Sequence, residues 1–407
     1  MTTTLASRTP AQTPTSTLNT GAFTIGYLSM VDALKVLVPV APALRMPPVL
    51  GCVLVTVTAG QVELSTFDFD TAVTVTLPAT NTEPGRMLLV HAAFTKLLAA
   101  VTKGASKAST ARLDVTVSTP DGIALVTANG YDLPLSDLSS VDSFPQLPVT
   151  ADPSFVVGRI ELNALAARVL VAVASNDPAR PILEGAKVEF DSMSLTLTAT
   201  DGFRAATGAI PATGGALASA VISTPILSKI LPRLTSDQIR LGVEVVHGTE
   251  WFTLADATTT VRARTLEGAY PKMDSFWDST AARTVTLDRA VLLQSATRAA
   301  ALTAALKAVS GGYGPSVSIA VDSETVTVAP WTGTSNDSRV KAPALPAEVT
   351  GETALWYSIF HPAQLIDAIG TMTGAKVTLR LNRPQRPAMF TDDTGFRHLV
   401  MPQQLPS

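Results

Sequence analysis

Hydrophobic and polar positions along this chain alternate in short stretches that predict β-strands, and these stretches are separated by segments with the spacing of amphipathic helices. Residues 62–68 and 195–201 each alternate as a strand that buries one face. In residues 94–101 the apolar side chains recur every three or four positions, as on one face of a helix. The mixture predicts an α+β fold, in which helices cover one face of antiparallel sheets.

The same pattern recurs along the chain. Val62, Leu64 and Asp68 are each followed 133 residues later by a matching residue, and so are four apolar positions of the helical segment 94–101. A third, weaker copy places Val326 a further 131 residues beyond Leu195. Three copies account for nearly the whole chain and predict a triplicated fold. We expect a disordered N-terminal tail at 1–22 and three domains at 23–150, 151–279 and 280–407.

Each copy is expected to open with a short strand, a capping residue and a helix. In the first copy residues 23–25 precede Ser29, and in the third copy residues 284–287 precede Asp288. Ser and Asp are favoured at helix N-caps because their side-chain oxygens accept backbone N–H groups. In the second copy the strand at 155–157 leads to a helix expected over 162–174.

Composition and charge exclude several classes of protein. The 407 residues are 46% hydrophobic and 15% charged, which suits several cores, and the net charge of −3 lacks the basic excess of proteins that hold nucleic acid by charge alone. No apolar run is long enough to span a membrane, so a cytoplasmic protein without membrane contact is expected. One cysteine and four scattered histidines predict neither disulfides nor a metal site.

Catalytic motifs are not evident either. The sequence contains no G-x-S-x-G, P-loop or dinucleotide-binding fingerprint. Asp68 and Asp70 could be imagined as a metal pair, but a solvated strand face is the more common use of such a spacing. We therefore expect no enzyme activity, no catalytic residues and no cofactor.

Three short motifs carry a family resemblance. The sequences ATDGFR at 199–204, LEGAYP at 266–271 and LVMP at 399–402 resemble, in order and spacing, the bacterial DNA sliding clamp, the β subunit of the replicative DNA polymerase III holoenzyme. The resemblance spans residues 23–405 and implies a processivity factor. Such a factor is a head-to-tail homodimeric ring that encircles double-stranded DNA, is loaded by a clamp loader and tethers the replicative DNA polymerase. A β-rich structural or assembly protein with the same triplicated fold and no function on DNA remains the alternative.

The resemblance also implies a hydrophobic cleft, formed by the second domain and the C-terminal tail, where partner peptides dock. Most of the matching positions are apolar or glycine, and for Leu183 a role in closing the domain core is equally plausible. The matching residues are Leu183, Thr200, Gly202, Phe203, Arg204, Ala205, Pro271, Phe276, Leu399, Val400, Met401, Pro402 and Leu405.

In such a ring the helices face the DNA and the chain ends meet a second copy. The six expected helical stretches sum to a charge of +4 and leave −7 for the remainder, which favours this orientation. The DNA-facing residues are then Arg45, Lys96, Lys103, Arg168, Arg180, Lys229, Arg233, Arg298 and Lys307. For the dimer interface the resemblance points to Leu133 and Leu135 meeting Ala301 and Leu302, although the two leucines would also suit an ordinary core.

Overall fold

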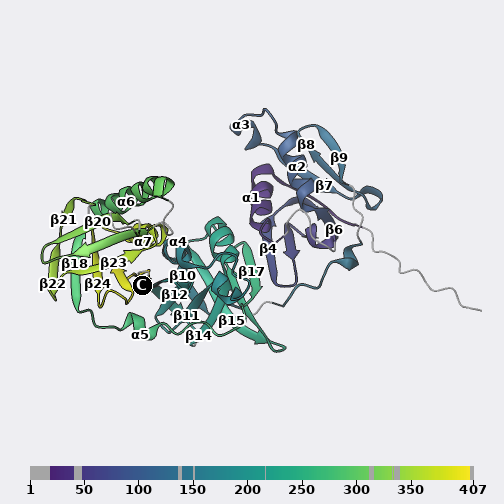
Figure 1. Ribbon diagram of the computed structural model, residues 1–407. Helices are drawn as coiled ribbons and strands as arrows, with labels where there is room; N and C mark the ends of the chain where they lie inside the picture. Colours follow the sequence, from purple (N-terminus) through teal and green to yellow (C-terminus); the bar gives the residue numbers. More distant parts are fainter. Residues whose placement is uncertain are drawn as a thin grey trace, which may run out of the picture. The chain divides into compact units, whose positions relative to one another are not determined.

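In the computed structural model, hairpins and helices occur in a similar order in each copy of the sequence repeat. The model describes residues 19–40, 48–135, 140–149, 152–215, 217–310, 316–331, 333 and 340–403, and of residues 307–310 only the backbone. These residues fall into two compact units. The first comprises the described part of residues 1–151 together with Ala255–Ala263, and the second comprises the described parts of residues 152–254 and 264–407. Figure 1 draws most of the first unit in purple and blue.

The first unit contains two antiparallel ladders and a pair of helices that contact each other. One ladder has the order β5-β1-β7-β8-β9, and in the other β6, β2, β3, β4 and β17 pair in that order. Helix α1 contacts α2 and lies against β3, β4 and β7. The bounds are β1 (Ala22–Gly26), α1 (Tyr27–Leu37), η1 (Pro48–Gly51), β2 (Cys52–Thr58), β3 (Gln61–Phe67), β4 (Thr71–Pro78), β5 (Thr80–Glu83), β6 (Gly85–Val90), α2 (His91–Val101), α3 (Lys107–Thr110), β7 (Asp114–Ser118), η2 (Pro120–Gly122), β8 (Ala124–Ala128), β9 (Tyr131–Leu135), η3 (Val141–Ser143) and β17 (Thr259–Arg264).

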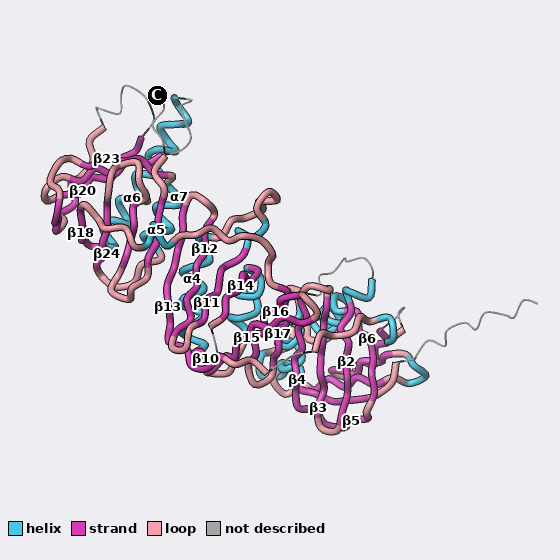
Figure 2. Tube along the Cα trace, turned by 90° about the horizontal axis from the view of Figure 1, so that it is seen from below, coloured by secondary structure: helices cyan, strands magenta, loops and turns pink. Residues whose placement is uncertain are grey.

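The first part of the second unit is built on the hairpin strands β11, β12 and β13, which Figure 2 shows side by side. Strand β14 pairs with β11, and β10 pairs with both β13 and β15. Helix α4 packs on β12 and β13. The bounds are β10 (Phe155–Gly158), α4 (Arg159–Val169), η4 (Leu170–Ala172), η5 (Pro181–Glu184), β11 (Gly185–Phe190), β12 (Ser194–Thr200), β13 (Arg204–Gly214), β14 (Ala218–Ser223), η6 (Ile226–Ile230), η7 (Leu231–Arg233), β15 (Gln238–Val246), β16 (Thr249–Ala255) and α5 (Asp274–Trp277).

The C-terminal part of the second unit continues the same ladder. Strand β26 pairs with β13 on one side and with β25 on the other, and β24, β18 and β22 follow. A separate four-stranded sheet has the order β21-β20-β19-β23, and α6 packs on its strands and on α7. The bounds are β18 (Arg283–Asp288), α6 (Arg289–Ser310), β19 (Ser316–Val321), β20 (Thr325–Trp331), β21 (Ala344–Pro346), β22 (Glu348–Gly351), β23 (Trp356–Phe360), α7 (Pro362–Gly370), β24 (Lys376–Leu381), β25 (Ala388–Thr391) and β26 (Arg397–Val400).

A common element order recurs three times. Strands β1, β10 and β18 each run directly into a helix, and each pairs with a later strand, namely β7, β15 and β24. The repeated positions Val62, Leu64, Leu195 and Leu197 are fully buried, because alternate side chains of a strand point to the same face. Antiparallel sheets covered by helices confirm the predicted α+β fold.

Two of the predicted helix starts are wrong and one is confirmed. Helix α1 begins at Tyr27, so Ser29 lies inside it and caps nothing. Helix α4 begins at Arg159, earlier than expected, because the chain turns directly from β10 through Gly158. Helix α6 does begin after Asp288, whose Oδ1 accepts the backbone N–H of Val291 at 2.8 Å.

Candidate functional site

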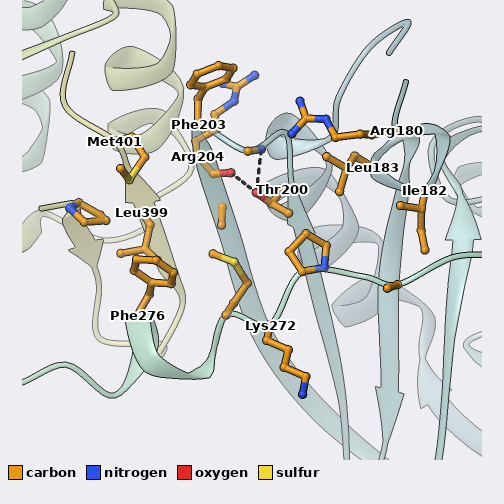
Figure 3. Close-up of a pocket in the computed structure, with 16 residues that line it drawn as sticks. Arg180, Ile182, Leu183, Thr200, Phe203, Arg204, Lys272, Phe276, Leu399 and Met401 are labelled. Carbon is orange, nitrogen blue, oxygen red and sulfur yellow. Dashed lines mark hydrogen bonds between the residues drawn. The ribbon is translucent and has the colours of Figure 1, made fainter. Parts of the chain in front are cut away.

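A cleft of about 420 Å³ lies in the second unit, at the point where β13 meets β26. Ala205 is paired with Leu399 across the two strands, and the backbone N–H of Met401 donates to the carbonyl of Phe203 at 2.8 Å. The segment that precedes and includes α5 closes the third side, so that Phe276 faces Leu399 in Figure 3. The C-terminal strand therefore forms one wall of the cleft.

A tight turn between β12 and β13 shapes the rim. The Asp201 carboxylate accepts the backbone N–H groups of Phe203 and Arg204 at 2.8 and 2.9 Å, which closes the turn. Gly202 has φ +90°, a conformation that side chains disfavour, and a Cβ there would lie 2.8 Å from Nη1 of Arg180. Because the turn is fixed in this way, Phe203 projects outward and is 61% exposed.

Apolar side chains form the floor of the cleft. Ala205, Trp277, Met389 and Leu399 make a buried cluster, against which Phe276 packs. A second buried cluster lies on the other wall and consists of Ile182, Leu183 and Val221, with Leu266 and Tyr270 packed against it. Such a hollow suits apolar side chains of a ligand, which leave water on binding.

Charged groups near the cleft are fixed by ion pairs. Arg204 makes ion pairs of 3.0 Å with Asp201 and 2.5 Å with Asp367 on α7. Behind it His398 is fully buried, and its Nδ1 lies 3.2 Å from Oγ1 of Thr371. Burial and the positive charge of Arg204 lower the pKa of His398 to about 3, so the imidazole is neutral at physiological pH.

Among the residues that the structure describes, no group of three or more His, Cys, Asp or Glu side chains is placed to hold a metal ion. Asp68 instead closes a turn, because its Oδ1 accepts the backbone N–H groups of Asp70 and Thr71. No helix in the described ranges is both long and apolar enough to cross a membrane.

Comparison with known proteins relates the whole chain to one family. The family model "DNA polymerase III beta subunit, central domain" matches residues 157–272. The beta sliding clamp of Streptomyces coelicolor is 25% identical over 380 residues, which cover 89% of this chain and 94% of that protein. The beta sliding clamp of Micrococcus luteus is 29% identical over 259 residues, which cover 62% of this chain and 79% of that protein.

The chain is a distant homologue of the bacterial beta sliding clamps over nearly its whole length. It is a DNA polymerase processivity factor, an accessory subunit without catalysis, and this replaces the alternative of a structural protein without function on DNA. Solved structures show the same fold. The sliding clamp of Pseudomonas aeruginosa bound to griselimycin is 18% identical, covers 95% of this chain and 100% of that one, and gives a TM-score of 0.80. The clamp of Bacillus subtilis, also 18% identical, covers 95% and 99% and gives 0.79.

Ten of the residues that the sequence assigns to the clamp cleft lie together in it. Val400 does not, because it alternates with Leu399 and Met401 along β26 and is fully buried. Pro402 borders a neighbouring hollow beside Tyr357, and Leu405 lies outside the described residues. The ten are Leu183, Thr200, Gly202, Phe203, Arg204, Ala205, Pro271, Phe276, Leu399 and Met401.

Six further lining residues were not assigned to the cleft from the sequence. Lys272 and Met273 directly follow the LEGAYP motif, and Ile182 precedes Leu183, so adjacency to matched positions was an available signal. Pro387 comes from the β24–β25 turn, which is not adjacent in sequence to any matched position. The six are Arg180, Ile182, Ala269, Lys272, Met273 and Pro387.

The predicted DNA-facing residues divide into four groups, the last of which is Arg168 alone. Lys96, Lys103, Lys229, Arg233 and Arg298 are exposed on or beside helices. Arg45 lies outside the described residues, as does the side chain of Lys307. Arg180 lines the cleft, and its guanidinium is held there by an ion pair of 2.9 Å with Asp177.

Arg168, in contrast, is mostly buried and ion-paired within the chain. Its side chain is only 17% exposed, its Nη2 lies 2.5 Å from Oδ2 of Asp392, and its Nε donates to the carbonyl of Thr371. The guanidinium also lies 3.8 Å from the ring centre of Phe396. These contacts attach α4 to the C-terminal strands and pair the Arg168 charge with a carboxylate.

The predicted dimer residues lie on two elements. Leu133 and Leu135 are on β9, where Leu133 is half-buried and Leu135 is buried. Ala301 and Leu302 are exposed on α6. Among the described strands, β9 lies at one edge of its sheet.

Proposed function

We propose that two copies of this chain join head to tail into a closed ring around duplex DNA. In this ring the cleft at β13 and β26 is the docking site for the polymerase and the clamp loader. The three repeats, residues 23–150, 151–279 and 280–407, are then the three domains that each copy contributes.

The strand-pairing pattern within the chain carries the ring proposal. In the first repeat the start of β4 pairs with β17, the last strand of the second repeat. In the second repeat the start of β13 pairs with β26, the last strand of the third repeat. In the third repeat, β21 is an edge strand of its sheet among the described strands. The last strand of the first repeat, β9, is also an edge strand.

A second copy of the chain can supply a partner for the edge at β21. If the first repeat of one copy follows the third repeat of the other, the edges near β21 and β9 meet, and the pairing pattern continues around a ring. Meeting in this way also covers two strand edges that would otherwise expose unpaired backbone groups. The exposed Leu302 and the half-buried Leu133 then have an apolar environment.

Weak charge suits a ring that slides. The helical stretches expected to face DNA sum to only +4, with exposed cations such as Lys96, Lys229 and Arg298, and each phosphate that a protein neutralises adds salt-dependent affinity. Encirclement retains the DNA by topology, so the cations need only attract the backbone without arresting movement.

The cleft suits short, exchangeable peptides. Burying one apolar side chain of a partner contributes about 1.5–3 kcal/mol, so two or three anchors give roughly micromolar binding after the costs of association. Polymerase and loader can then use the same cleft in turn, because neither is held permanently.

Mass and DNA topology test the ring. Light scattering after gel filtration should give twice the chain mass of 42.4 kDa. Protein loaded on nicked circular DNA should remain bound through gel filtration and should leave when a restriction enzyme linearises the circle. A monomer at micromolar concentration, or retention that linearisation does not change, would contradict the proposal.

A further inference from the structure

A second hollow adjoins the cleft. It has a volume of about 580 Å³, and Phe276, Pro387 and Leu399 line both spaces, so that a ligand in one borders the other. Three arginines, Arg380, Arg383 and Arg386, line it. The cleft is therefore continuous with a space of opposite character, basic where the cleft is apolar.

The three arginines come from one hairpin. Arg380 lies near the end of β24, and Arg383 and Arg386 lie in the turn that leads to β25, where the backbone N–H of Arg386 donates to the carbonyl of Arg383 at 2.9 Å. Arg380 is half-buried and its Nη2 lies 3.4 Å from the carbonyl oxygen of Ser279, whereas the other two are exposed. The turn thus holds three cations beside the docking cleft.

Acidic side chains of the described residues balance the three arginines only in part. Within the described part of the chain none of the three guanidinium groups forms an ion pair, in contrast to Arg180 and Arg204 in the cleft. Glu352 is the one acidic side chain that lines the hollow, so the hollow carries an excess of positive charge.

We propose that the hollow selects partner peptides that carry acidic residues beside their apolar anchors. The inference rests on the docking function proposed above and specifies the partner chemistry of that site. Because the two spaces share lining residues, the acidic side chains must lie within a few residues of the anchors, at about 3.3 Å of extended chain per residue. The carboxylates bind the guanidinium groups as charge-assisted hydrogen bonds.

The position of the hollow favours a peptide over DNA. Its lining residues come from the α5 segment, the β22 end, strands β24 to β26 and the β24–β25 turn, and none comes from α4, α6 or α7, the helices that the ring proposal turns toward DNA. Three of the lining residues also line the peptide cleft. The residues that flank the anchors of a bound peptide therefore lie close to the arginines.

Two matched peptides test the proposal. Both contain a Leu-Phe anchor flanked on each side by three residues, which are Asp in one peptide and Asn in the other. Fluorescence anisotropy with the full-length protein should show the Asp peptide binding about fivefold more tightly at low salt, since exposed ion pairs each contribute modestly. The preference should disappear in 0.5 M salt and in the variant Arg383→Gln/Arg386→Gln.

Controls separate this inference from the docking function. The variant Arg112→Gln/Arg240→Gln removes the same charge at exposed positions outside the hollow and should keep the preference. Equal binding of both peptides to the unmodified protein would overturn the inference and leave the cleft assignment standing. Absence of binding by either peptide would overturn both. Weaker binding of DNA by Arg383→Gln/Arg386→Gln, with the peptide preference intact, would assign the arginines to phosphate instead.

Discussion

Phe203 shows how a single turn places a side chain for binding. Gly202 and the Asp201 carboxylate fix the backbone, so the ring is held at the rim while remaining 61% exposed. Replacing Phe203 with Ala should weaken peptide binding about tenfold, because part of an aromatic side chain no longer leaves water on binding. Stability should be unchanged, because the ring packs against little in the free protein.

Peptide titration by calorimetry measures this effect. Met193→Ala is a suitable control, since Met193 is 78% exposed in the same unit but outside the cleft. Equal affinities for Phe203→Ala and the unmodified protein would remove Phe203 from the docking surface.

His398 makes stability depend on pH. Its pKa is lowered to about 3 in the folded protein by burial and by Arg204, against about 6.5 when unfolded. Only the unfolded chain takes up this proton as the pH falls below 6.5. The free energy of unfolding should therefore be fully retained above pH 6.5 and fall by about 2 kcal/mol by pH 5. Burial also lowers the pKa of His91, which adds a change of the same sign.

Denaturant titrations at pH 7 and pH 5 check the size of this change, and His398→Gln should reduce it. NMR titration of the His398 ring gives an independent measurement in the unmodified protein. A ring that titrates near pH 6 would contradict the prediction.

Among the elements, α4 is attached to the C-terminal strands by one arginine. Arg168 reaches Asp392 in the turn between β25 and β26, and that carboxylate also accepts the backbone N–H of Thr373. Arg168→Gln should lower the free energy of unfolding by about 2 kcal/mol, because it leaves a buried carboxylate without its cation.

A double-mutant cycle with Asp392→Asn isolates this contact, with tryptophan fluorescence during denaturation as the measurement. Arg240→Gln, an exposed arginine on β15, should change stability by less than about 0.5 kcal/mol. Weakened DNA retention without loss of stability in Arg168→Gln would support the expectation that this residue faces DNA.

At the scale of the whole molecule, ring closure depends on surfaces that a single copy leaves open. Leu302 is 48% exposed on α6. Leu302→Asp should leave the monomer folded but give a mass near 42.4 kDa and abolish retention on nicked circular DNA, because a charge would be buried at the junction. Binding of peptides to the cleft should persist.

Val291→Asp is the matched control for this variant. Val291 is 43% exposed near the N-terminal end of the same helix, eleven residues before Leu302. A dimer that survives Leu302→Asp would show that this residue is not at the junction.

Sequence reasoning located most of the cleft but did not predict that Arg168 is ion-paired. Short motifs located Thr200, Phe203 and Leu399, because the turn and the last strand are each built from adjacent residues. Strand alternation could also have excluded Val400, which lies between two residues that face the cleft. Sequence patterns could not identify Pro387 as a lining residue of the cleft or Asp392 as the partner of Arg168. Both depend on segments that come together only on folding.

The sequence by itself determined the threefold repeat and the α+β class, because both follow from the periodicity of apolar positions along short segments. Only the tertiary structure decided which cations are neutralised, which strands become edges and that a basic hollow adjoins the apolar cleft. Each of these depends on the distance between segments far apart in the chain, such as Arg168 and Asp392 or Phe276 and Pro387, and no local pattern records that distance.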